Sequence, residues 1–319
     1  MSRPGPTTAA PLPTALALLT VYLVWGSTYL AIAYVVDSMP PFLSAGARYL
    51  VAGVILLGFL WLHGRFRRSS GERERPTLAH WRSAVIIGML LLLGGNGLVV
   101  LAEQPGLLTS GVAALLVATE PIWMNLFEAI LQRRRPSALV VAGVLAGFIG
   151  VVILVFPTDG VAEVSPFGVL LVLIASLCWA VGSLYERRAP VPRSPWLGTG
   201  MEMLAGGAAL LVLAILTGEP GRTDVSSFTT ESILALGYLV VFGSLVVFSA
   251  YIWLLHNAPV STIATYAYVN PIVAVALGAW LRSEEVTPRT ILAAAIILGA
   301  VVAMVSGRPR EGEPATRSS

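Results

Sequence analysis

Two short stretches decide the fold: Val117-Ala118-Thr119-Glu120-Pro121-Ile122 and Ala267-Tyr268-Val269-Asn270-Pro271-Ile272. Each places a polar residue before a proline, about halfway along an apolar run that is long enough to cross a bilayer. Because proline has no backbone N–H, inside a helix Pro121 frees the Val117 carbonyl and Pro271 frees the Ala267 carbonyl. Lipid hydrocarbon cannot satisfy a free carbonyl. We therefore expect both helix breaks to face protein or a water-filled cavity.

The composition indicates an integral membrane protein. Of the 319 residues, 56% are hydrophobic and 12% are charged, whereas a soluble domain carries roughly 25% charged residues. Cys178 is the single cysteine, which excludes a disulfide within the chain, and the three histidines lack metal-ligand spacing. We expect no metal site and no cofactor. The expected surroundings are a lipid bilayer, and no nucleic-acid partner is expected.

Apolar runs of about 20 residues predict ten transmembrane helices. They cover residues 14–36, 42–62, 82–101, 109–130, 138–156, 166–185, 197–217, 232–254, 261–281 and 290–306. Residues 1–13 and 307–319 are rich in Pro, Ser and Arg and are expected to be tails. The predicted fold class is therefore all-α and membrane-spanning.

The placement of arginine predicts the orientation. If both termini are cytoplasmic, sixteen of the twenty arginines lie in the inner segments, and Arg222, Arg282 and Arg289 lie in the outer ones. An excess of positive charge marks the cytoplasmic side of membrane proteins. We expect a multi-pass protein of the inner (plasma) membrane with both termini in the cytoplasm.

The two halves of the chain resemble each other. An offset of 154 residues carries Trp25 to Trp179 and Arg48 to Glu202, and an offset of 150 carries Glu120-Pro121 to Asn270-Pro271. Since five spans per repeat is an odd number, the second repeat enters the membrane inverted, as in many secondary transporters. We expect a first repeat at 14–156, a linker at 157–165 and a second repeat at 166–306, arranged around a central cavity.

Several ordered motifs carry a family resemblance. They are Trp25-Gly26-Ser27-Thr28-Tyr29, Ala47-Arg48-Tyr49, Gly94-Gly95-Asn96-Gly97, Ala102-Glu103-Gln104, Phe242-Gly243-Ser244 and Thr265-Tyr266-Ala267-Tyr268-Val269-Asn270-Pro271. This series resembles the EamA domain of the drug/metabolite transporter superfamily, present as two tandem copies. The resemblance implies ten helices, a cavity shared by both halves and alternating access, commonly for export of amino acids or other small metabolites.

The expected function is secondary active transport of a small metabolite or drug-like compound, with protons as the candidate coupling ion. An uncoupled facilitator or exchanger of the same fold is the alternative. A membrane enzyme would need a clustered acid–base set or metal ligands near one interface, and a sensor would carry a large soluble module. The sequence offers neither feature, so we expect no enzyme activity. It does not predict whether the protein is a monomer or a homodimer.

Charged side chains within apolar spans are costly, about 2.5–3.5 kcal/mol each at a helix centre. Glu120 is the deepest such residue, and we interpret it as a site for a substrate ammonium group or for the coupling proton. An ion pair with Arg48, or a cap for the carbonyls freed near Pro121, is the structural alternative. Arg48 can bind a substrate carboxylate through its planar fork, and it can equally hold helices together. Glu103 lies nearer a helix end.

Aromatic and amide side chains complete the candidate cavity. Tyr266 and Asn270 lie four residues apart on one helical face, and so do Trp25 and Tyr29. A pocket lined by apolar surface with a few polar groups is typical of small-molecule sites. Helix packing is the alternative for each residue. The candidate cavity residues are Trp25, Tyr29, Arg48, Asn96, Glu120, Trp179, Tyr266 and Asn270.

Overall fold

The described part of the chain is helical throughout. The computed structural model describes residues 11–62, 75–131, 138–155, 164–258, 260–263 and 265–306, and no β-strand occurs among them. Most of the expected tails and linker, and most of the inner arginine clusters, lie outside these residues. Residues 11–13 are an exception, because they begin the first helix.

The helices follow the predicted spans closely. The first half contains α1 (Pro11–Thr20), η1 (Val21–Trp25), α2 (Gly26–Val36), α3 (Pro41–Leu62), α4 (Leu78–Ile87), η2 (Gly88–Gly97), α5 (Leu98–Ala102), α6 (Ser110–Val117), α7 (Glu120–Leu131) and α8 (Ala138–Val155). The second half contains α9 (Pro166–Glu186), α10 (Pro195–Leu216), α11 (Glu219–Arg222), η3 (Val225–Ser227), α12 (Thr230–Val240), η4 (Val241–Val246), α13 (Val247–Asn257), α14 (Val260–Ile263), α15 (Tyr266–Arg282) and α16 (Pro288–Ser306). The elements η1, η2 and η4 are wide π-helical turns within otherwise continuous spans.

Six helical runs among the described residues are long and apolar enough to cross a membrane. They are Leu12–Val36, Pro41–Leu62, Leu78–Ala102, Pro166–Glu186, Pro195–Leu216 and Thr230–Leu255. The other predicted spans correspond to shorter or interrupted apolar helices, at Ser110–Met124, Val141–Ile153, Val269–Arg282 and Pro288–Ala300. The protein is therefore an all-helical membrane protein.

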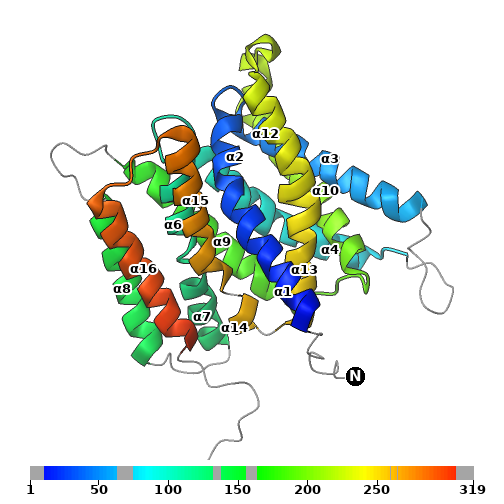
Figure 1. Cartoon of the computed structure of the whole chain (residues 1–319). Helices are drawn as coiled ribbons and strands as arrows, with labels where there is room; N and C mark the ends of the chain where they lie inside the picture. The colour runs from blue at the N-terminus through cyan, green and yellow to red at the C-terminus, as the bar shows by residue number, and fades with distance from the viewer. Residues whose placement is uncertain are drawn as a thin grey trace, which may run out of the picture.

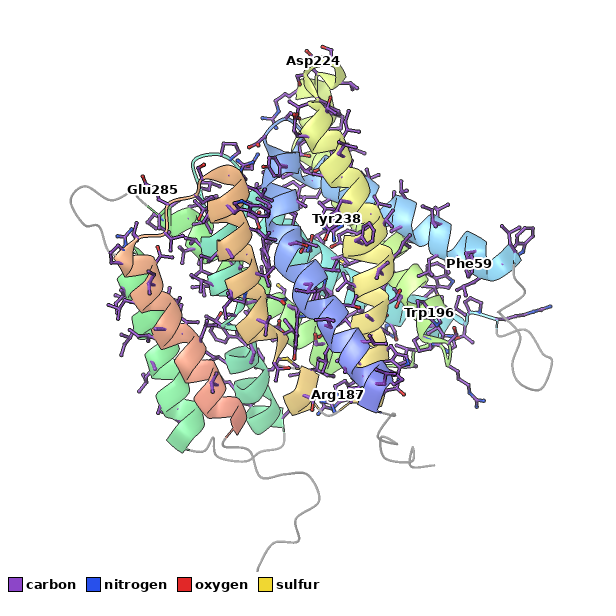
Figure 2. All side chains as sticks on the ribbon, viewed as in Figure 1. Phe59, Arg187, Trp196, Asp224, Tyr238 and Glu285 are labelled. Atoms are coloured by element: carbon purple, nitrogen blue, oxygen red, sulfur yellow. The ribbon has the colours of Figure 1, made fainter. Side chains whose placement is uncertain are left out.

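The bundle has two ends (Figure 1). We call the end where α1 begins and α16 finishes the terminal end, and the opposite end, with the turns after α2 and α15, the loop end. Figure 2 places Arg187 at the terminal end, and Asp224 and Glu285 at the loop end. The terminal end is the one predicted to face the cytoplasm.

Hydrogen-bonding caps fix where two of the helices begin. Ser165 precedes Pro166, and its hydroxyl accepts a hydrogen bond from the Gly168 N–H at 3.3 Å, which is a standard N-cap. The N-terminus of α3 is capped from a distance, because the Glu219 carboxylate accepts hydrogen bonds from the N–H groups of Phe42 (3.2 Å) and Leu43 (2.7 Å). A carboxylate at this position also meets the positive end of the helix dipole.

Helices α3 and α10, which occupy corresponding positions in the two halves, pack through reciprocal glycine contacts. Gly46 meets Leu211 and Gly200 meets Leu57, while Gly53 meets Leu204 and Gly207 meets Leu50. Each contact maps onto its partner when 154 is added or subtracted. A Cβ on Gly207 would lie 2.7 Å from the Leu50 backbone nitrogen, so close packing requires glycine there. Helices α8 and α16 also pack against each other.

Candidate functional site

The break between α6 and α7 presents Glu120 to the interior. Helix α6 ends at Val117, and Ala118 and Thr119 form a turn before α7 begins at Glu120. Proline fits at this point because an N–H in the first turn of a helix has no intrahelical partner. The Thr119 carbonyl instead accepts the Ile122 N–H at 2.9 Å. The Glu120 side chain is 2% exposed.

The second break differs from the predicted one. Pro271 lies within α15, which runs without interruption from Tyr266 to Arg282. The chain turns earlier, at Thr265, where the Thr265 hydroxyl donates to the Thr262 carbonyl at 2.5 Å and meets the Tyr22 hydroxyl at 2.5 Å. Packing against α1–α2 therefore fixes the break five or six residues before the proline.

A small cavity lies between the two halves. Its volume is about 60 Å³. This space is enough for a few water molecules but smaller than a drug-sized ligand needs. Among the residues around it are seven of the eight sequence-predicted site residues: Trp25, Tyr29, Asn96, Glu120, Trp179, Tyr266 and Asn270.

Glu120 is linked across the cavity to the second half of the chain. The Tyr266 hydroxyl donates a hydrogen bond to the Glu120 Oε2 atom, and both side chains are buried. The other oxygen, Oε1, is buried without a hydrogen-bond partner among the described residues. A buried carboxyl with a free oxygen is costly, so the site is suited to a proton or a cationic ligand.

Arg48 lies outside this cavity. Its Nε atom donates to the Ser244 hydroxyl at 2.8 Å and its Nη2 atom donates to the Gly243 carbonyl at 2.7 Å. The guanidinium carbon also lies 4.7 Å from the centre of the Tyr49 ring. These contacts tie α3 to η4, and they match the helix-holding alternative rather than an ion pair with Glu120.

Asn270 fixes the start of α15. In the orientation that satisfies its hydrogen bonds, the Asn270 amide nitrogen donates to the carbonyl oxygens of Tyr22 (3.1 Å) and Tyr266 (3.3 Å). Asn96, at the end of η2, has a buried side-chain oxygen with no hydrogen-bond partner in the described part of the chain. The cavity therefore combines a fixed amide, an unsatisfied amide oxygen and a carboxyl group.

Aromatic rings close one side of the cavity. The Trp25 ring centre lies 5.5 Å from that of Trp179, 4.8 Å from that of Tyr251 and 5.4 Å from that of Tyr266. The contacts with Trp179 and Tyr266 are edge-to-face, a packing that is favourable beyond simple burial. The faces of aromatic rings also attract cations.

Sequence reasoning missed several residues at this site. Thr28, Tyr49, Ser176 and Phe248 line the cavity, and Tyr251 joins the aromatic cluster. Ser176 precedes Trp179 by three residues, which places both on one helical face, so its position was predictable. Nothing in the local sequence around Phe248 distinguishes it from the other apolar residues of its span.

The fold defines a polytopic helical membrane protein with a polar and aromatic cavity between its helices. Comparison with protein families then supplies the family. A model of the EamA-like transporter family matches residues 12–156 and again residues 166–306. The chain belongs to this family.

Individual relatives agree with this assignment. The "Uncharacterized inner membrane transporter YedA" of Escherichia coli K12 is 38% identical over 292 residues, which cover 92% of this chain and 90% of the relative. The "Uncharacterized transporter YoaV" of Bacillus subtilis is 24% identical, covering 88% and 93% respectively. A protein of known crystal structure, 21% identical, matches 92% of this chain and 97% of its own with a TM-score of 0.62, a likeness that concerns the fold alone.

Proposed function

We propose that this protein is a secondary active transporter that exports a small molecule in exchange for protons. The observation that carries the proposal is the buried Glu120 carboxyl, which lies at the central cavity with one oxygen unpartnered among the described residues. A proton and a positively charged substrate can each neutralise this carboxylate, and they cannot do so together. Competition for one charge is sufficient to couple their movements.

The substrate class follows from the charges at the cavity. Arg48 is held by Ser244 and Gly243, and no arginine occurs among the cavity-lining residues. The cavity instead provides a carboxyl and aromatic faces, which favour an ammonium group. Amino acids, amines and cationic drug-like compounds share that group. Amino acids and drug-sized amines need a larger space than about 60 Å³, so the proposal requires the central cavity to widen when it binds its substrate.

The proposed mechanism is alternating access between two inverted repeats of five helices. The contact of Gly46 with Leu211 is repeated by that of Gly200 with Leu57, and these matching contacts support a pseudo-two-fold axis between α3 and α10. An axis in the membrane plane allows equivalent rearrangements to open either end. The arginine distribution supports a cytoplasmic terminal end, and the relative YedA is named as an inner membrane transporter.

Flux measurements on the reconstituted protein test the proposal. Amino acids and cationic amines are first screened by thermal shift, and the compounds that stabilise the protein are then followed into vesicles under an imposed pH gradient. We expect flux that follows the gradient and is lost in Glu120→Gln. The exposed Glu231→Gln variant serves as the control and retains flux.

Two results distinguish the alternatives. Flux of an identified substrate that ignores the pH gradient indicates an uncoupled facilitator or exchanger. Flux that survives the combined Glu120→Gln and Asn270→Ala substitutions shows that the central cavity is not the transport site.

A further inference from the structure

A second cavity opens at the loop end. It offers about 400 Å³ to the centre of a water molecule and lies between the ends of α2, α5, α6 and α15. We call it the vestibule. Its charged lining residues are Asp37, Glu103, Arg282, Glu284, Glu285 and Arg289.

Two of the vestibule carboxylates are satisfied by neighbouring groups. Asp37 accepts hydrogen bonds from Arg282 at 2.6 and 3.2 Å. Glu284 caps α6, because it accepts from the Ser110 N–H (3.2 Å), the Ser110 hydroxyl (2.8 Å) and the Gly111 N–H (3.2 Å). The negative charge of each is therefore compensated.

Glu103 differs from both. Its side chain is 3% exposed, and neither carboxyl oxygen has a hydrogen-bond partner among the described residues. It directly follows the C-terminus of α5, where the helix dipole disfavours a negative charge. Burial raises the pKa of Glu103 well above its usual range, the Glu284 carboxylate raises it further, and Arg282 opposes them.

The vestibule and the central cavity share the same helix faces. On α5 and the preceding turn, Asn96 and Val99 line the central cavity and Glu103 lines the vestibule. On α2, Tyr29 lines the central cavity, while Ala33, four residues later, lines the vestibule. Residues at these spacings lie above one another on a helix, so the two cavities lie at successive levels of the same helix faces.

Tyr29 and Glu120 both line the central cavity, on the helix faces that lead to the vestibule. The charged groups that share the vestibule with Glu103 are Asp37, Arg282, Glu284, Glu285 and Arg289.

We propose that Glu103 is a second proton-binding site, which receives protons at the loop end and delivers them to Glu120. Hydronium in the vestibule gives its proton to the Glu103 carboxylate and becomes water. The protonated Glu103 then releases that proton along the cavity to the Glu120 carboxylate, and Glu103 returns to its charged form. This inference rests on the proposed proton-coupled function, and it adds the entry point of the proton.

Infrared spectroscopy of the full-length protein in vesicles tests the protonation of Glu103. A titration with pH reports the C=O band of protonated carboxyl groups, which shifts in deuterated water. We expect one band to disappear in Glu103→Gln and to persist at a shifted frequency in Glu103→Asp. The matched control is Glu285→Gln, an exposed acid of the same vestibule (Figure 2), which leaves the band in place. An unchanged band in Glu103→Gln overturns the proposal.

The delivery step is measured by the charge displaced after a sudden pH change on the loop side of vesicles that hold the protein. We expect slower displacement in Glu103→Gln, recovery in Glu103→Asp and wild-type behaviour in Glu285→Gln. A band that is lost while the displacement stays at the wild-type rate overturns the relay and leaves the proposed function standing. Charge displacement that is unchanged in Glu120→Gln contradicts the proposed function itself. In that variant the infrared band of Glu103 is expected to remain, so the two failures can be told apart.

Discussion

The Glu120 carboxyl and the Tyr266 hydroxyl come from different halves of the chain and meet at the central cavity. A hydroxyl that donates to a carboxylate stabilises its charged form. The bond also joins α7 to α15 across the cavity. On the proposed mechanism, this bond links the charge of Glu120 to the relative position of the two halves.

Replacing Tyr266 with Phe removes this hydrogen bond and keeps the ring. Without the donor, the protonated form of Glu120 is favoured, so we expect transport to reach half its maximum at a higher pH than in the wild type. Flux measured across a series of pH values checks the shift. A Tyr266→Phe profile that overlays the wild-type profile contradicts a role for this bond in coupling.

The contacts of Arg48 with Ser244 and Gly243 favour a structural role for this residue. Arg48→Ala leaves the Ser244 hydroxyl and the Gly243 carbonyl without their buried donor. The expected loss is about 1–3 kcal/mol of stability, the usual cost of an unsatisfied buried group. Thermal unfolding in detergent measures it. Because Arg48 does not line the central cavity, substrate affinity of the folded variant is expected to match the wild type, and weakened affinity contradicts this assignment.

At the scale of elements, the packing of α3 on α10 depends on glycine. A Cβ at position 207 meets the Leu50 nitrogen at 2.7 Å and the Gly46 carbonyl at 3.1 Å, and neither backbone atom can move alone. By contrast, Gly58, also on α3, has open space within 4 Å. The two positions form a matched pair. An alanine at position 207 is expected to push α3 and α10 apart, whereas an alanine at position 58 meets no neighbouring atom.

We expect Gly207→Ala to lower stability by about 1–3 kcal/mol, as is typical of overpacking. Gly58→Ala removes a flexible residue from a helix and is expected to be neutral or slightly stabilising. Thermal unfolding of the two variants in the same detergent makes the comparison. Equal stability of the two contradicts the close approach of α3 and α10.

At the scale of the whole molecule, the spans were predictable and some side-chain partners were not. Apolar runs located the long helices, such as Pro41–Leu62, because bilayer thickness fixes their length. The pairing of Glu120 with Asn270 at one cavity followed from the offset of 150 residues between the two halves. Arg48 was harder, because its partner Ser244 lies 196 residues away and no local pattern connects them. The second helix break also depends on a distant contact, between Tyr22 and Thr265.

The most direct test of the central claim is the number of protons released when a cationic substrate binds. Calorimetry of the purified protein, repeated in buffers with different ionisation enthalpies, gives that number. If a proton and the substrate compete for Glu120, binding to the wild type releases protons near neutral pH, and Glu120→Gln abolishes the release. Binding to the wild type without proton release, or undiminished release in Glu120→Gln, contradicts the account.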